Sequence, residues 1–306
     1  MANYLVTGVA GFIGAAVAQS LLAQGHRVIG VDNLSTGYQE AVPSGVEFYE
    51  AGCEAAATWE AVPALEYAAI LHIAGQSSGE VSFENPVYDL QTNAQSTLLL
   101  LQLARKLGVK RFLYASTMSV YGDQPDAPVN ESALCAPKSF YGVGKLASEH
   151  YLRIYAEQFG LETVALRLFN VYGPGQNMAN LKQGMVSIYL AQALKNRHIL
   201  VKGSADRFRD FVYIDDVVAA FETLLSTPIS GYRCYNIATG QKTTVGNLID
   251  AIAKALPFET TVEFSGGTPG DQFGITGDAA LIAQEVGWKP RIVMDEGLKR
   301  MVAWAL

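Results

Sequence analysis

Three glycines close to the N-terminus constrain the fold more than any other feature of the chain. Gly8, Gly11 and Gly14 follow the apolar run 4–7, typical of a buried parallel strand, and open a segment at 15–24 that is typical of a helix. In such a turn the first glycine permits the tight bend, the second lets the backbone approach a pyrophosphate, and the third allows close packing of helix on strand. The helix N-terminus then presents amides to the anion.

A carboxylate completes this unit. Residues 28–32 are typical of a second buried strand, and Asp32 at its end comes 18 residues after Gly14 (32 − 14), near the roughly 20 of a dinucleotide-binding unit. Asp32 can accept hydrogen bonds from both ribose hydroxyls and would repel a 2′-phosphate, so NAD is favoured over NADP. The alternative is a glycine-rich turn that only packs helix against strand and binds no ligand. Asp32, at the expected distance from the turn, disfavours this alternative. The predicted cofactor site also includes Phe12, Ile13 and Asn33.

Strand and helix patterns alternate as far as residue 169. This predicts an α/β fold, a Rossmann-type doubly wound parallel sheet that binds NAD over residues 1–169. Further strands are expected at 46–49, 69–75, 111–115 and 163–168, and long helices at 88–107 and 141–159.

The alternation loosens after this point, which predicts a smaller C-terminal α/β substrate lobe over most of 170–306. Elements near 210–240 are expected to return to the first domain, with 235–238 as a strand of the main sheet. Within the lobe the patterns predict helices at 183–194 and 248–256 and strands at 199–201 and 261–264.

Composition excludes several function classes. The chain has 306 residues and a net charge of −7 without a basic cluster, which argues against nucleic-acid binding because that depends on neutralising phosphates. No apolar run reaches the roughly 20 residues of a membrane span, and a strand pattern begins near the N-terminus, so we expect no membrane contact and no signal peptide. The three distant cysteines predict free thiols in a reducing cytoplasm. The four histidines lack ligand spacing, which predicts no metal site.

Two residues on the second long helix suggest chemistry. Tyr141 and Lys145 are four apart, so a helix places them on one face. A phenol beside a fixed ammonium ion ionises more readily, which would give a general base without a metal. Taken alone the spacing is common, and a surface tyrosine beside a solvated lysine is the simpler interpretation. The hydroxyls of Ser116, Thr117 and Ser119 follow a predicted strand at the sheet edge where ligands bind, although most such clusters cap turns.

Seven motifs in one order resemble those of a known family. Together they are similar to the extended short-chain dehydrogenase/reductases, specifically the NAD-dependent sugar-nucleotide epimerase/dehydratase family. The resemblance spans nearly the whole chain. The motifs are Gly8-x-x-Gly11-x-x-Gly14, Asp32, Ala74-Gly75, Ser116-Thr117-x-Ser119-Val120-Tyr121-Gly122, Tyr141-x-x-x-Lys145, Leu166-Arg167-x-x-Asn170-Val171-Tyr172-Gly173-Pro174 and Arg209-Asp210-Phe211-Val212.

The resemblance implies tightly bound NAD and a nucleoside-diphosphate sugar as substrate. It implies that Tyr141 takes the proton from a sugar hydroxyl, that Thr117 bonds the same oxygen, and that Lys145 holds the nicotinamide ribose and stabilises the phenolate. A tyrosine pKa near 10 would have to fall by about 3 units, and Lys145 and the cofactor charge are the expected causes. Ala74, Gly75 and Cys53 are further expected cofactor contacts.

The expected substrate contacts also come from the resemblance. Asn170 would contact the diphosphate and Arg209 a phosphate, which suits a guanidinium fork. An ion pair of Arg209 with Asp210 or Asp216 is the alternative. The remaining expected substrate contacts are Gln76, Thr117, Ser119 and Asp271.

Departures from the family pattern narrow the reaction. Sugar 4,6-dehydratases of this family carry Asp-Glu where this chain has Met118 and Ser119, and neither donates a proton readily. The cysteine and lysine pair of epimerases acting at C3 and C5 is missing as well. Thr268 replaces a second phosphate-binding arginine, and Cys53 replaces an aspartate near the adenine. Ile275 stands near a position where some relatives place a bulky aromatic residue against the sugar, so an N-acetylated hexose is not excluded.

We therefore expect a cytoplasmic, NAD-dependent nucleotide-sugar 4-epimerase that forms a transient 4-keto intermediate from a UDP-hexose or UDP-N-acetylhexosamine. The alternatives are a nucleotide-sugar dehydratase or decarboxylase on the same fold, and a non-catalytic NAD-binding regulatory protein. A homodimer is expected by family analogy, with the helices around Leu98 and Tyr151 forming a four-helix contact.

Overall fold

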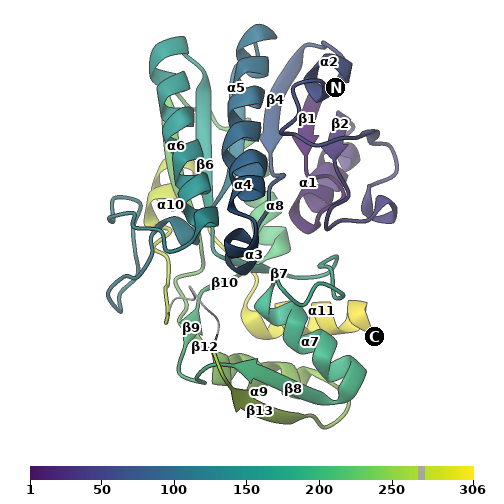
Figure 1. Ribbon diagram of the computed structural model, residues 1–306, viewed down its shortest axis with the longest axis vertical. Coiled ribbons are helices and arrows are strands. Elements are labelled where there is room, and N and C mark those ends of the chain that lie inside the picture. The colour runs from purple at the N-terminus through teal and green to yellow at the C-terminus, as the bar shows by residue number, and fades with distance from the viewer. Residues whose placement is uncertain (268–272) are drawn as a thin grey trace.

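A seven-stranded parallel sheet forms the larger of two lobes in the computed structural model, which describes residues 1–267 and 273–306 (Figure 1). The strand order β11-β6-β5-β4-β1-β2-β3 places the first strand in the middle of the sheet, as in doubly wound folds. The strands are β1 (Asn3–Thr7), β2 (Arg27–Asp32), β3 (Glu47–Glu50), β4 (Tyr67–His72), β5 (Arg111–Thr117), β6 (Glu162–Leu168) and β11 (Tyr232–Ile237).

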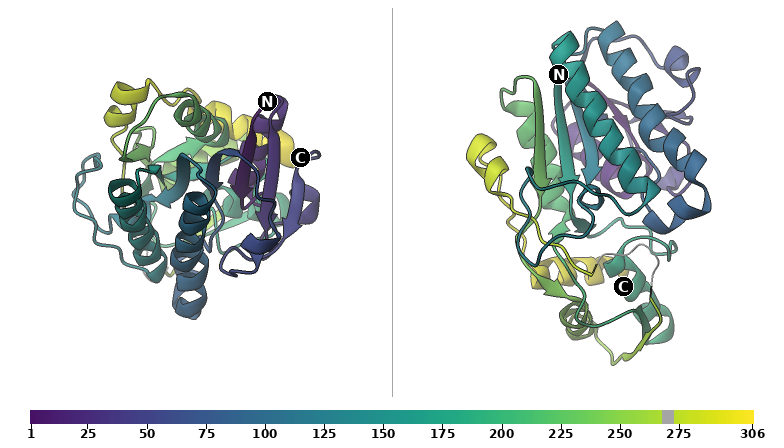
Figure 2. Two further views of the ribbon diagram at one scale, coloured as in Figure 1. Left: turned by 90° about the horizontal axis from the view of Figure 1, so that it is seen from above. Right: turned by 60° about the vertical axis from the view of Figure 1, so that its left-hand side comes forward.

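Helices cover both faces of this sheet (Figure 2). Because successive side chains on a strand point to opposite faces, Val6 packs in the core on one face and Leu5 in the core on the other. Burial on both faces explains the nearly continuous apolar runs of the sequence. One face carries α1 (Phe12–Ala23), α8 (Ile214–Ser226) and α10 (Ala280–Val286), and the other α2 (Thr58–Ala61), α5 (Ser96–Lys106) and α6 (Phe140–Phe159).

The second lobe lies beyond the carboxyl ends of the strands (Figure 1) and has its own apolar core. Its helices are α7 (Met185–Asn196), α9 (Val245–Ala255) and α11 (Met294–Ala305). Its strands pair as β7 (Asn170–Tyr172) with β10 (Phe211–Tyr213), β8 (His198–Lys202) with β13 (Thr261–Ser265), and β9 (Phe208–Arg209) with β12 (Thr243–Thr244). The predicted α/β fold class is confirmed, and β11 pairs with β6 in the main sheet. The division at residue 169 stays a prediction.

The helix expected at 88–107 is interrupted. It begins as α4 (Pro86–Leu90), continues through a π-helical turn (Gln91–Gln95) and ends as α5. The start is earlier than predicted because the Asn85 Oδ1 accepts a hydrogen bond from the Tyr88 amide at 3.2 Å and Pro86 occupies the first turn. The other short elements are the 3₁₀ turns η1 (Gln39–Ala41) and η3 (Met118–Val120), and α3 (Gly79–Glu84). Among the described helices, none has the length and apolarity needed to cross a membrane.

The glycine turn brings α1 directly onto β1. The amide of Gly11 donates to the Gly8 carbonyl at 3.0 Å. A Cβ added at Gly14 would lie 1.9 Å from the Gly8 carbonyl oxygen, whereas one added at Gly11 would lie 3.2 Å from the same atom. Of these two helix-start positions, only Gly14 therefore requires a glycine for the packing of the protein itself.

We predict that Gly14→Ala lowers the free energy of unfolding of the cofactor-free protein by about 3 kcal/mol, because overpacking against rigid backbone must displace α1. Urea denaturation followed by circular dichroism measures this. Gly11→Ala is the matched control, with an expected loss of about 1 kcal/mol for alanine at a helix N-cap. Equal losses in the two variants would contradict the packing role assigned to Gly14.

Candidate active site

A cavity of about 720 Å³ lies where the carboxyl ends of the sheet strands meet the second lobe, a size typical of ligand sites. Residues of both lobes line it. Among the described residues, it brings together every site residue that the sequence predicted except Arg209. These are Gly8, Gly11, Phe12, Ile13, Gly14, Asp32, Asn33, Cys53, Ala74, Gly75, Gln76, Thr117, Ser119, Tyr141, Lys145 and Asn170.

One end of the cavity is suited to an adenosine diphosphate moiety. Asp32 accepts hydrogen bonds from the backbone amides of Ala10 (3.0 Å) and Leu34 (2.8 Å), which fix the carboxylate at the end of β2. The first turn of α1 carries no acidic residue, so its amides are available to an anion. Cys53 also lines this end, and burial raises the pKa of its thiol, so the thiol stays neutral.

The candidate catalytic residues converge from two elements. Thr117 ends β5 and its Oγ1 accepts a hydrogen bond from the Ser119 amide at 3.1 Å. Tyr141 and Lys145 lie in the first two turns of α6, which Ser139 caps. Only 9% of Tyr141 and 3% of Lys145 is exposed to solvent. This burial excludes the simpler interpretation of a surface tyrosine beside a solvated lysine.

The pKa values of Tyr141 and Lys145 differ from the expectation. Burial raises the pKa of Tyr141 to about 12, and a hydrogen bond with Thr117 opposes this only in part. Burial also lowers the pKa of Lys145 to about 8. The predicted lowering of the tyrosine pKa by Lys145 is therefore absent from the protein alone. The main cause is burial; the Lys145 ammonium donates to the Ala115 carbonyl at 3.0 Å and lies 4.7 Å from the Tyr114 ring centroid and 5.9 Å from that of Tyr141.

A buried ion pair behind the hydroxyl strand was not predicted. Arg167 on β6 and Glu149 on α6 meet at 2.7 Å, with 6% and 3% of their side chains exposed. The Ser116 hydroxyl donates to Glu149, and Arg167 also lies 4.7 Å from the Tyr121 ring centroid. The pair ties β5, β6 and α6 together next to Thr117. Glu149 lies one turn after Lys145 on the same helix, and this spacing is the only signal that the sequence offers.

The two predicted phosphate contacts have different surroundings. The Asn170 amide lines the cavity and donates to the Asp210 carbonyl (3.0 Å) and to the Met118 Sδ (3.5 Å). Arg209 is buried and is not among the described residues that line the cavity; its guanidinium donates to the carbonyls of Phe208 (2.7 Å) and Phe273 (3.2 Å).

The carboxylates offered as alternative partners of Arg209 accept backbone amides. Asp210 accepts from Thr239, Gly240 and Gly277, and Asp216 from Arg291 and Ile292. Ile275, near the position where some relatives place an aromatic residue, is 2% exposed and packs in a small apolar cluster that includes Phe169 and Met118 of the cavity lining. Asp271 and Thr268 lie outside the described residues.

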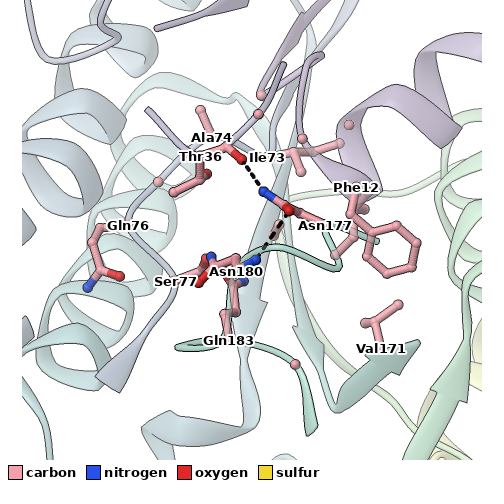
Figure 3. Close-up of a pocket in the computed structure, with 18 of the residues that line it drawn as sticks. Phe12, Thr36, Ile73, Ala74, Gln76, Ser77, Val171, Asn177, Asn180 and Gln183 are labelled. Carbon is pink, nitrogen blue, oxygen red and sulfur yellow. Dashed lines mark hydrogen bonds between the residues drawn. The ribbon is translucent and has the colours of Figure 1, made fainter. Parts of the chain in front are cut away.

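Residues 175–184, which we call the strap, were missed as site residues. The strap crosses from the second lobe to the loops of the first (Figure 3). Asn177 donates to the Thr36 carbonyl at 2.9 Å, and Gln183 donates to the Ser77 hydroxyl at 2.6 Å. Lys182 forms an ion pair with Glu84 at 2.7 Å. These contacts join segments about 100 residues or more apart, which local patterns do not reveal.

Comparison with known proteins identifies the family. Residues 4–238 match the model of the NAD dependent epimerase/dehydratase family. The chain belongs to this family. The structure is similar to that of the UDP-glucose 4-epimerase of Thermotoga maritima with UDP-glucose, at 34% identity and a TM-score of 0.95, covering 99% of this chain and 98% of that one. The chain is therefore an NAD-dependent enzyme of the extended short-chain dehydrogenase/reductase type.

Two further proteins to which the chain is similar are also UDP-glucose 4-epimerases. The UDP-glucose 4-epimerase of Thermus thermophilus in complex with NAD is 33% identical, with a TM-score of 0.92, and the match covers 99% of this chain and 98% of that one. The UDP-glucose 4-epimerase of Mycolicibacterium smegmatis is 34% identical, covering 97% of this chain and 96% of its own length. Within the described residues, no group of histidine, cysteine or acidic side chains could hold a metal ion.

Proposed function

We propose that the protein interconverts the C4 epimers of a UDP-hexose or UDP-N-acetylhexosamine through a transient 4-keto sugar. The observation that carries this proposal is the convergence of Thr117, Tyr141 and Lys145 on a cavity whose other end suits a dinucleotide. The residues present fit NAD, since Asp32 is fixed at the strand end and the first turn of α1 carries no acidic residue. When bound, NAD supplies a reversible hydride acceptor and a positive charge.

Tyr141 exchanges the proton of the sugar hydroxyl. Its pKa of about 12 in the protein alone means that the phenol is neutral near pH 7, so a positive charge must enter the cavity before it acts as a base. Thr117 donates to the same oxygen and Lys145 fixes the ribose. This dependence links proton removal to the presence of the cofactor.

The lining of the cavity disfavours dehydration. Elimination of water needs an acid and a base beside the sugar, yet Met118 and Ser119 occupy the positions next to Thr117. Among the described lining residues the acidic side chains are Asp32 and Glu54, both at the dinucleotide end. A 4-epimerase needs no further acid, because the proton that Tyr141 takes returns to the same oxygen.

We predict that Tyr141→Phe retains NAD and loses at least about 10²-fold in turnover, the low end for removal of a general base. Phenylalanine keeps the ring packing and removes only the hydroxyl. The bound cofactor is measured by absorbance after denaturation, and turnover by a coupled assay. Phe140→Leu, at the neighbouring half-exposed position, is the control and should stay within about threefold of the unchanged protein. Unchanged turnover of Tyr141→Phe would refute the mechanism.

We also predict a preference for sugars without a carboxylate. Lys145 is the only basic side chain among the described residues that line the cavity, and residues 268–272 contain no lysine, arginine or histidine. A uronate carboxylate would thus be desolvated without a free cation partner, at a cost of several kcal/mol. We expect kcat/KM for a UDP-hexose to exceed that for the matching UDP-hexuronate by about 10²-fold or more.

A panel of UDP-, dTDP-, GDP- and CDP-sugars, read by NMR and mass spectrometry, tests the reaction and this preference together. Epimerisation leaves the mass unchanged, whereas dehydration removes water and decarboxylation removes carbon dioxide. Loss of mass with a neutral hexose would replace the proposed reaction by dehydration. Equal turnover of hexose and hexuronate would overturn the proposed preference alone.

We propose that the enzyme is a cytoplasmic homodimer. The three free cysteines support a reducing compartment. Exposed apolar side chains support the dimer: Val87 and Leu90 on α4 are 62% and 56% exposed, and Val143 and Ile154 on α6 are 53% and 47% exposed. Helices α4 and α6 pack against each other, so these exposed side chains lie on neighbouring helices.

The prediction is that Ile154→Arg converts the dimer into a monomer, because a buried unpaired guanidinium opposes association. Light scattering at micromolar concentration measures the mass. Phe264→Arg is the matched control, since this side chain is 44% exposed on β13 of the other lobe and its substitution should leave the dimer intact. A monomeric unmodified protein would overturn the proposal.

A further inference from the structure

A buried carboxylate lies behind the catalytic pair and takes no part in the proposed proton transfer. Asp89 on α4 is only 1% exposed. Its Oδ1 accepts hydrogen bonds from the side-chain amides of Gln76 at 2.7 Å and Asn93 at 3.2 Å. Its Oδ2 is buried and has no hydrogen-bond partner among the described residues. Such an oxygen is costly to bury, so its retention next to an active site calls for a functional reason.

The unpartnered oxygen faces the catalytic helix. A Cβ added at Gly144 would lie 3.5 Å from Asp89 Oδ2 and 3.3 Å from Asn93 Cβ, so the glycine before Lys145 lets α6 approach closely. On the cavity side, a Cβ at Gly75 would lie 3.3 Å from Lys145 Nζ and 2.4 Å from Asn93 Oδ1. The Asn93 oxygen is also buried and unpartnered. The Asn93 oxygen and the buried ammonium thus lie next to Gly75, and the Asp89 oxygen lies next to Gly144, one residue before Lys145.

The carboxylate also organises the cavity wall. Gln76 lines the cavity, but its side-chain nitrogen donates to Asp89 and to the Ser78 carbonyl at 2.8 Å, and its side-chain oxygen accepts from the Ser78 amide. Figure 3 shows Gln76 apart from the strap residues that gather around Ser77. The Asn93 side chain donates to the Gln76 carbonyl at 3.0 Å. Asp89 therefore fixes the loop after β4 through its hydrogen bonds with Gln76 and Asn93.

The charge of Asp89 acts on both catalytic residues. It raises the pKa of Lys145, against the effect of burial, and it raises the pKa of Tyr141 in the same direction as burial. Burial raises the pKa of Asp89, while the amides of Gln76 and Asn93 and the Lys145 ammonium lower it.

Other titratable groups on the neighbouring elements do not replace this charge. Glu84 on α3 pairs with Lys182, and Glu149 on α6 pairs with Arg167. Burial keeps the pKa of His72 well below its ordinary value and raises that of Tyr114, so both are neutral. The remaining titratable side chains on α3 and α4 are Glu80 and Tyr88.

We propose that Asp89 is a positioning residue of the active site. Its hydrogen bonds hold Gln76 and Asn93 in place, and its negative charge balances the buried Lys145 ammonium together with the positive charge of oxidised NAD. The effect on turnover rests on the 4-epimerase function proposed above, whereas the effect on cofactor affinity does not.

The test variant is Asp89→Asn, which keeps the Oδ1 acceptor and the shape but removes the charge. Without that charge the pKa of Tyr141 falls, so the base ionises at lower pH. The acidic limb of the kcat/KM profile should therefore move to lower pH. The positively charged NAD+ should also lose affinity relative to NADH, so that the ratio Kd(NAD+)/Kd(NADH), measured calorimetrically on cofactor-free protein, rises about threefold or more.

Three further variants separate charge from structure. Gln76→Leu removes the hydrogen bond and keeps the charge, so it should change KM or kcat without moving the acidic limb or the affinity ratio. Asp216→Asn removes the charge of a buried aspartate on α8. It should move neither the acidic limb of the kcat/KM profile nor the ratio Kd(NAD+)/Kd(NADH). Asp89→Ser removes the charge in a smaller side chain and keeps the test intact if Asp89→Asn fails to fold. We expect Asp89→Ser to shift both quantities in the same direction as Asp89→Asn.

An unchanged affinity ratio in the charge-removing variants would overturn the proposal, even if no nucleotide sugar is turned over. A changed ratio without turnover by the unmodified protein would instead contradict the proposed function and leave the role of Asp89 standing. A shift of both quantities in Gln76→Leu as large as in Asp89→Asn would assign the effect to the loop and overturn the electrostatic role.

Discussion

The active site depends on keeping an ammonium group out of water. Lys145 is almost fully buried, and its surroundings compensate only partly for the lost hydration: one backbone carbonyl, the face of Tyr114 and the more distant Asp89. Desolvation disfavours the charged forms of neighbouring groups alike. The same burial therefore lowers the pKa of the lysine and raises that of Tyr141, and both are tuned by whatever charge enters the cavity.

This arrangement gives the two lobes different tasks. The sheet and α6 hold the proton-transfer groups rigidly, since β5, β6 and α6 are joined by a buried ion pair. The second lobe contributes the strap, whose polar side chains reach the loops after β2 and β4. The proton-transfer groups thus lie on regular elements, while a loop that bridges the lobes forms part of the cavity wall.

The sequence predicted what depends on local spacing. The glycine turn, Asp32 and the apolar strands could be placed because each carries a short-range pattern, and the carboxyl edge of a parallel sheet then brought Thr117 near Tyr141. The contacts that escaped prediction are long-range. Asp89 and Gln76 are separated by 13 residues and Asn177 and Thr36 by 141, and the pKa of Tyr141 reflects burial that only the folded chain creates.

The π-helical turn between α4 and α5 has a consequence for the orientation of these helices. A π turn accommodates one extra residue, and each residue advances an α-helix by about 100°. The turn therefore rotates the residues before it relative to those after it. Asp89 can face α6 while Leu100 and Ala104 pack on the sheet. It also leaves the Asn93 carbonyl to accept the hydroxyls of Thr97 and Ser148. A one-residue deletion here would restore a regular helix and turn the acidic side chain away from the catalytic pair.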